Sequence, residues 1–154
     1  MKKTILSCLI ILFITSVVST YSQSFNIGDT GPAGGIIFFD RGVNSSSWQY
    51  LEAAPAEFEF SANWNSANEM VRLLNINGYT DWRLPTREEL NLMYVNLKLQ
   101  GLGSFKDDFY WSSTVEQVVV TFAMYHHFGS GLVLGADQLG RRIISCNVRP
   151  VRQF

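Results

Sequence analysis

Residues 78–90 read GYTDWRLPTREEL, and this stretch decides the fold of the chain. Pro85 stands directly before Thr86-Arg87-Glu88-Glu89, which has the form of a helix capping box. In such a box the threonine hydroxyl accepts the backbone N–H of the third helical residue, and the carboxylate of that residue accepts the threonine N–H. The stretch therefore predicts a helix from Arg87 to about Leu97, preceded by a rigidly held loop.

A second helix is expected on the N-terminal side of this stretch. Ser66 can cap it, and Glu69 follows at the third helical position, so the helix should run to about Asn75. Its apolar residues recur with the spacing of one helix face, and they are Ala67, Met70, Val71 and Leu74. The pattern predicts an amphipathic helix with one buried side.

Two short strands are expected before the helices. Residues 36–39 are apolar, a polar turn follows, and residues 48–53 resume an extended pattern, which together predict a hairpin. Residues 54–65 combine proline, glutamates and aromatic side chains, and they are expected to form a loop.

The part of the chain after the helices is rich in β-branched and aromatic residues. Residues 109–114 lead into it, and segments 118–128, 132–134 and 141–151 predict a three-stranded meander. The order of strands, two helices and further strands predicts an α+β domain.

The first 22 residues have the pattern of a secretory signal peptide. Lys2 and Lys3 supply the charged start, residues 5–18 are mostly apolar, and small residues follow. The apolar run is shorter than the roughly 20 residues that a bilayer-spanning helix needs. We therefore expect a signal peptide at 1–22 and one domain at 23–154, in a protein that is secreted, periplasmic or on the cell surface. No stable membrane span is expected after removal of the signal.

Charge and cysteine content restrict the partners and the means of stabilisation. The net charge of −1 does not indicate nucleic-acid binding. Only Cys146 would remain after removal of the signal, so the domain must be stabilised by its core rather than by a disulfide. Cys146 itself is expected to be a small buried side chain.

Five segments, taken together and in this order, resemble one protein family. They are Gly34-Gly35-Ile36-Ile37-Phe38-Phe39, Tyr50-Leu51-Glu52-Ala53-Ala54-Pro55, Asp81-Trp82-Arg83-Leu84-Pro85-Thr86 with Glu89-Leu90, Tyr110-Trp111-Ser112-Ser113, and Val148-Arg149-Pro150-Val151-Arg152. The combination resembles the Lcl C-terminal domain family of bacteria. The resemblance implies a C-type-lectin-like fold, related also to formylglycine-generating enzymes. In that fold two helices pack on a twisted, mainly antiparallel sheet, and the first and last strands are adjacent.

The same resemblance implies a location and a class of ligand. Family members are secreted or displayed on bacterial surfaces, and those in collagen-like adhesins are thought to bind sulfated glycosaminoglycans. This chain lacks a long collagen repeat, so trimeric display does not follow from the resemblance. The expected partner is a polysaccharide or a surface protein.

Aromatic and arginine residues in these motifs are the candidates for ligand binding. Trp82 or Trp111 could stack on a sugar ring, Ser112 could hydrogen bond to it, and Arg83, Arg149 and Arg152 could contact an anion. A structural role is the alternative: Trp82 would fill the core, and Arg149 and Arg152 would pair with carboxylates such as Asp81. Arg141 and Arg142 are further candidates for partner binding, because no acidic residue lies among the arginines at the end of the chain.

No catalytic site or cofactor is expected. His126 and His127 are adjacent, so they would point to opposite faces of a strand, and no nucleophile elbow accompanies the serines. Asp107 and Asp108 are weak candidates for a calcium site, because calcium prefers a larger set of oxygen ligands.

The sequence therefore predicts a non-catalytic, surface-exposed bacterial binding module for a glycan or a protein. A structural domain of the cell envelope is the first alternative. A secreted hydrolase with an unrecognised site is the second.

Overall fold

The computed structural model describes residues 23–43, 47–117, 121–137 and 139–154. The expected signal peptide, residues 1–22, lies outside this part of the chain. The described residues form an α+β structure with two sheets and three α-helices, which confirms the predicted class.

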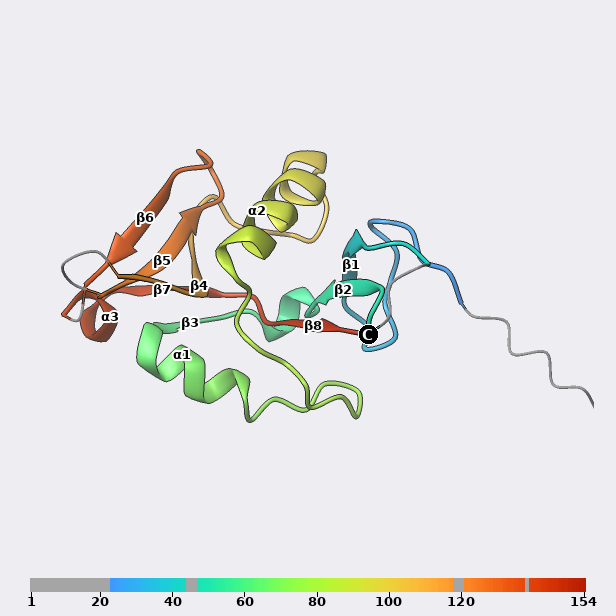
Figure 1. Ribbon diagram of the computed structural model, residues 1–154, viewed down its shortest axis with the longest axis horizontal. Coiled ribbons are helices and arrows are strands. Elements are labelled where there is room, and N and C mark those ends of the chain that lie inside the picture. Colours follow the sequence, from blue (N-terminus) through green and yellow to red (C-terminus); the bar gives the residue numbers. More distant parts are fainter. Residues whose placement is uncertain (1–22, 44–46, 118–120, 138) are drawn as a thin grey trace, which may run out of the picture.

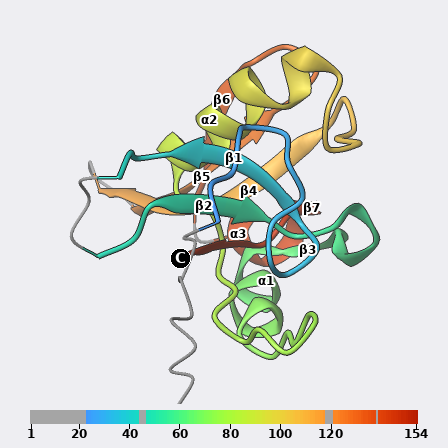
Figure 2. The same cartoon turned by 90° about the vertical axis from the view of Figure 1, so that its right-hand side faces the viewer.

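A three-stranded sheet is built from segments that are far apart in sequence. Strands β1 (Ile36–Asp40) and β2 (Tyr50–Ala53) form the predicted antiparallel hairpin. Strand β8 (Val151–Gln153) pairs with the other edge of β2. Figure 2 shows the three strands together at one end of the molecule. The first and last strands thus share a sheet, but β2 separates them, so they are not the direct neighbours that the resemblance implied.

The second sheet has five strands in the order β3-β7-β4-β5-β6. They are β3 (Phe60–Asn63), β7 (Ser145–Val148), β4 (Phe109–Gln117), β5 (Thr121–His127) and β6 (Val133–Ala136). All neighbouring pairs are antiparallel except β4 and β7, which pair in parallel through Tyr110 and Asn147.

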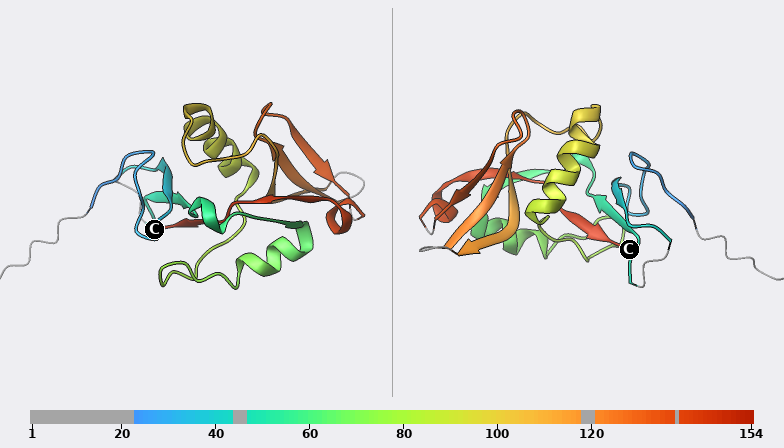
Figure 3. Two further views of the ribbon diagram at one scale, coloured as in Figure 1. Left: turned by 180° about the vertical axis from the view of Figure 1, so that it is seen from behind. Right: turned by 45° about the horizontal axis from the view of Figure 1, so that its top comes forward.

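The two long helices cover opposite faces of the five-stranded sheet (Figure 3). Tyr110 and Trp111 are adjacent in β4, so their side chains point to opposite faces. Tyr110 belongs to the core under α2 (Arg87–Asn96), whereas Trp111 belongs to the core under α1 (Trp64–Val71). The sheet is therefore buried on both sides.

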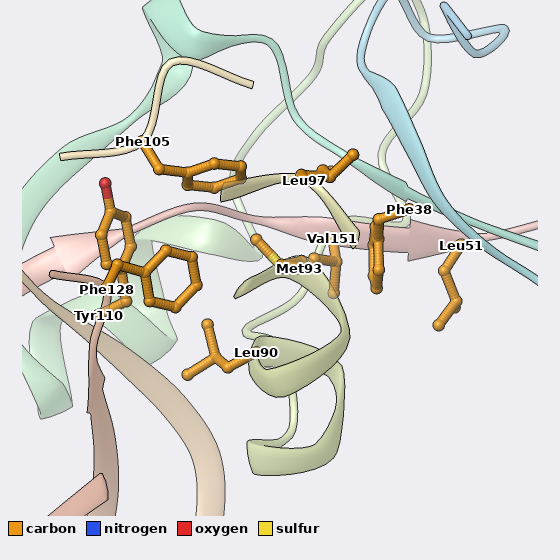
Figure 4. Close-up of a cluster of buried hydrophobic side chains, with 10 residues drawn as sticks. Phe38, Leu51, Leu90, Met93, Leu97, Phe105, Tyr110, Phe128 and Val151 are labelled. Carbon is orange, nitrogen blue, oxygen red and sulfur yellow. The ribbon is translucent and has the colours of Figure 1, made fainter. Parts of the chain in front are cut away.

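The core under α2 also joins the two sheets. Leu90 and Met93 of the helix, with Leu97 directly after it, pack against residues of both sheets. Figure 4 shows these side chains with those they contact, which are Phe38, Leu51, Phe105, Tyr110, Phe128 and Val151. A helix whose apolar residues recur every three or four positions can fill such a junction.

The capping box at Thr86 is confirmed. The Thr86 hydroxyl accepts from the Glu89 N–H at 3.1 Å, and the Glu89 carboxylate accepts from the Thr86 N–H at 2.8 Å. The helix begins at Arg87 and ends at Asn96, close to the predicted bounds.

The predicted cap of the first helix is wrong. Asn63, not Ser66, precedes the helix, and its side-chain oxygen accepts from the Ser66 N–H at 3.0 Å. The helix runs from Trp64 to Val71 rather than from Ser66 to about Asn75. Ser66 is therefore the helical residue whose N–H is capped, not the capping residue.

This arrangement predicts unequal effects at the two positions. Asn63→Ala should lower the free energy of unfolding by about 1 kcal/mol, because it leaves a helix N–H without its side-chain acceptor. Ser66→Ala should change it by less than about 0.5 kcal/mol. Urea unfolding of the two variants measures both values, and a larger loss for Ser66→Ala would contradict the assignment.

Two further predictions for the strands are corrected. The expected loop at 54–65 contains β3, preceded by a short 3₁₀ turn at Ala56–Phe58. The expected last strand at 141–151 is instead helix α3 (Gly140–Ile143), then β7, then the start of β8. Residues 118–120 of the predicted segment 118–128 lie outside the described part of the chain. In the described part the meander holds only for its first two segments, because β7 pairs with β3 and β4 and leaves β6 at the edge.

Candidate functional site

The aromatic–arginine motif at residues 81–83 connects strand β8 to the start of helix α2. Trp82 is buried, and its indole N–H donates to the Tyr79 carbonyl at 3.1 Å. Asp81 accepts from Arg152 Nε at 2.9 Å, which is the pairing considered as the structural alternative.

Arg83 is bound on two sides. Its guanidinium donates to both oxygens of Glu89 at 2.6 Å, and this contact raises the pKa of Arg83. Its backbone exchanges hydrogen bonds with Val151 at 3.0 and 2.9 Å, so the loop adds to the edge of β8. Arg83 thus connects the start of α2, through its side chain, to the strand that completes the smaller sheet, through its backbone.

Trp111 and Ser112 lie inside the larger sheet. Neither has exposed surface. Trp111 Nε1 donates to the Ala62 carbonyl at 2.9 Å, and the Ser112 hydroxyl donates to the Met124 carbonyl at 2.9 Å. Their hydrogen-bonding groups are therefore occupied by other strands of the same sheet.

Arg149 and Arg152 are also buried and paired. Arg149 Nη2 lies 2.8 Å from Glu59 Oε2, and its guanidinium lies 4.4 Å from the centre of the Phe105 ring. Arg152 bridges Asp81 and Glu52, the latter at 3.1 Å, and lies over the Tyr79 ring. The burial of Glu52 raises its pKa. The two arginines stand at different places and do not converge on one open surface.

The weak metal candidates are engaged separately. Asp107 pairs with Lys98 at 2.6 Å, whereas Asp108 accepts from the Asn147 amide at 3.0 Å. Within the described ranges no three histidine, cysteine or acidic side chains form a group suited to a metal ion. Cys146 is buried, and burial raises the pKa of its thiol to about 12.

Three arginines without an ion pair in the described part of the chain lie near the two ends of helix α1. Arg72, Arg141 and Arg142 make no ion pair with any described residue. Arg72 follows α1, and the other two lie in α3, which contacts α1. Figure 3 shows α3 beside the start of α1. These three guanidinium groups are therefore not engaged in ion pairs with described residues.

A groove of about 390 Å³ follows the exposed side of α1, and we call it the α1 groove. It is lined by Trp64, Asn65, Asn68, Glu69 and Arg72. These positions share one face of the helix, because they recur at spacings of one, three and four residues. The groove thus combines an aromatic ring, two amides and a cation, together with one acidic group.

Trp64 is fixed at one end of the α1 groove. Its indole N–H donates to the Ser112 carbonyl at 2.8 Å, while part of the side chain stays accessible. The Arg141 guanidinium lies 5.4 Å from the centre of the ring, within the range of a cation–π contact. Arg141 therefore adds a second cation beside the groove at a defined place.

Two other hollows lack such charge. The hollow of about 460 Å³ beside α2 is lined by Arg87, whose guanidinium pairs with Glu88 and Glu116. The hollow of about 270 Å³ near β1 includes Arg149, which Glu59 neutralises. The α1 groove is the better candidate for an anionic or hydroxyl-rich ligand.

The sequence pointed to only part of this site. Arg141 and Arg142 were candidates because no acid lies among the terminal arginines, whereas Trp64 fell in the expected loop at 54–65. The groove could have been found if the helix had been started at Trp64, because Trp64, Asn68 and Arg72 then fall on one face.

A comparison with protein-family models identifies the family of the chain. The family model for the Lcl C-terminal domain matches residues 42–152, which is more than half of the chain. A search of curated proteins found no match.

Proposed function

The chain belongs to the Lcl C-terminal domain family, and on that premise we propose that it is a non-catalytic surface binding module that recognises a polyanionic polysaccharide through the α1 groove. The family suggests surface association, and the proposal includes the C-type-lectin-like arrangement that the resemblance implied. None of the helices in the described part of the chain has the length and apolar character that a bilayer crossing requires.

The observation that carries the proposal is the pair of cations, without ion-pair partners in the described part of the chain, at the two ends of the α1 groove, one of them over the accessible Trp64 ring. Arg72 and Arg141 lie at the groove with no carboxylate partner among the described residues, so a ligand would not have to displace an ion pair. Guanidinium groups bind sulfate and carboxylate in bidentate fashion. Asn65, which is exposed, can add hydrogen bonds to sugar hydroxyls.

The absence of catalysis is part of the proposal. It is supported by the state of the groups that a hydrolase would use. The Ser112 hydroxyl is committed to a backbone carbonyl, and the ring of His126 is buried. A serine nucleophile needs a positioned base beside it.

Retention of the purified protein on immobilised heparin and dextran sulfate tests the proposal. The double variant Arg72→Glu/Arg141→Glu should bind about tenfold more weakly, because each reversal replaces an attraction by a repulsion, and retention should fall with salt. Unmodified dextran should retain the protein weakly.

Arg41→Glu is the matched control. Arg41 also lies over a tryptophan, Trp48, at 4.9 Å, and it makes no ion pair with a described residue. It differs from Arg141 in lying away from the α1 groove. Equal weakening by Arg41→Glu, or undiminished binding of the double variant, would reject the groove as the site.

A protein partner in the cell envelope is the alternative function. It is favoured by the burial of Arg149, Arg152 and Trp111, which leaves these family-motif side chains unavailable to a polysaccharide. Capture of a defined envelope protein, together with no retention on any polysaccharide, would select this alternative.

A further inference from the structure

Three large apolar side chains are exposed around helix α3. Leu139 is 64% exposed, Ile143 67% and Ile144 36%. Together with Arg142 we call them the α3 tip. Figure 1 shows α3 at one end of the long axis, opposite the described N-terminal segment. A cluster of exposed apolar residues at a projecting end marks an interaction surface more often than scattered single residues do.

The α3 tip is exposed because the other side of the helix is anchored. Gly140 is buried, and a Cβ at this position would lie 3.0 Å from the Ala136 Cβ. Its N–H donates to Asp137 Oδ1 at 2.8 Å, and the Arg141 N–H donates to the Asp137 carbonyl at 2.9 Å. The helix therefore cannot rotate its apolar side inward without losing these contacts.

The charge of the α3 tip indicates which kind of surface it could bind. Arg141 and Arg142 have no ion pair with a described residue, and the one carboxylate of the segment, Asp137, already accepts the Gly140 N–H. The tip thus combines apolar side chains with net positive charge. That combination suits a membrane interface, where apolar groups enter the acyl boundary and arginines contact phosphate.

We propose that the α3 tip docks on the surface of an anionic lipid bilayer. Leu139 and Ile143 lie four residues apart on one side of the helix, so both can enter the interface together. Arg142, which is exposed between them in sequence, would contact the headgroups. This contact goes beyond the polysaccharide proposal, since it uses side chains that do not line the α1 groove.

Co-sedimentation of the full protein with vesicles tests the proposal. The protein should bind vesicles that contain phosphatidylglycerol and bind pure phosphatidylcholine at least tenfold more weakly. Leu139→Gln/Ile143→Gln should weaken binding to the anionic vesicles about tenfold, and Arg142→Gln should weaken it by a smaller factor.

Leu73→Gln/Leu99→Gln is the matched control, because these leucines are 84% and 59% exposed and lie outside the tip. It should bind like the unchanged protein. Equal loss in this control, or full vesicle binding by the tip variant, would overturn the proposal. A self-associating protein that the tip variant converts to monomer, without vesicle binding, would also overturn it and assign the patch to a second copy. Retention on heparin by the tip variant should be unchanged, which separates this test from that of the α1 groove.

Discussion

Replacement of Glu59 by leucine is expected to lower the free energy of unfolding by about 3–5 kcal/mol. The Glu59 side chain is 4% exposed, and its carboxylate binds three groups: Arg149 at 2.8 Å, Lys106 at 2.9 Å and the Tyr110 hydroxyl at 2.9 Å. Burial raises the pKa of Tyr110, so this hydroxyl remains a donor at ordinary pH. Loss of the carboxylate leaves the buried Arg149 charge without its counter-ion.

A double variant separates that unpaired charge from the loss of packing. Glu59→Leu/Arg149→Met removes both charges, so it should recover a substantial part of the stability that the single variant loses. Urea unfolding of both proteins gives the comparison. Glu88→Gln is the control, since Glu88 is 65% exposed and pairs with Arg87 at the surface, where the expected change is below about 1 kcal/mol. A single variant no less stable than this control would contradict the role of Glu59.

Acidification is expected to destabilise the protein through His126. This side chain is 1% exposed, and neither ring nitrogen has a hydrogen-bond partner among the described residues. It lies between the rings of Tyr94 and Phe128, with centroid distances of 5.1 and 5.2 Å. Burial lowers the pKa of His126, because the charged imidazolium would lose its hydration there.

The direction of the pH effect follows from this shift. The unfolded chain takes up a proton at a pKa of about 6.5, whereas folded His126 resists protonation until lower pH. The free energy of unfolding should therefore be highest above about pH 6.5. Below it, this one group removes up to about 1.4 kcal/mol per pH unit until the folded pKa is reached.

The measurement is urea unfolding across this pH range for two variants. His126→Leu places an apolar side chain between the rings of Tyr94 and Phe128. It should remove the part of the decrease in the free energy of unfolding at low pH that His126 causes. His127→Gln is the matched control, because its ring is on the opposite face and contacts Ser130 at 2.9 Å. If His126→Leu loses stability on acidification as steeply as the unchanged protein, His126 is not the group responsible.

Local signals predicted the parts of the fold that depend on neighbouring residues. The capping box needs only residues 86–89, and the β1–β2 hairpin needs only a polar turn between two apolar runs. The first helix shows the limit of such signals, because asparagine and serine are both good caps. What favours Asn63 is the pairing of β3 with β7, which places Asn63 opposite Ser145 and fixes where the helix starts.

Non-local pairing accounts for the remaining differences. Residues 141–151 look like one strand, but Pro150 lacks an N–H and follows Arg149, whose side chain is drawn inward by Glu59. The chain is thereby divided into β7 and β8, which belong to different sheets. Sequence periodicity contains no information on a partner strand 100 residues away.

The predicted site residues show the same limit. Trp82, Arg83, Trp111, Ser112, Arg149 and Arg152 were chosen for chemistry that a ligand and a protein interior both require. Whether these side chains bind a ligand or stabilise the interior depends on where carboxylates and carbonyls lie in the folded chain. The α1 groove, in contrast, depends on Arg72 and Arg141 making no ion pair with a described residue.

The pairing of β2 with β8 sets the order in which the molecule can acquire structure. Arg152 and Glu52, which are 100 residues apart in sequence, form a hydrogen-bonded ion pair between β8 and β2. The smaller sheet is complete only when both strands are present. A nascent polypeptide that has emerged as far as α2 still lacks the strand that closes this sheet. Folding must therefore be largely post-translational and slow relative to helical proteins of this size, since it waits for high-contact-order closure.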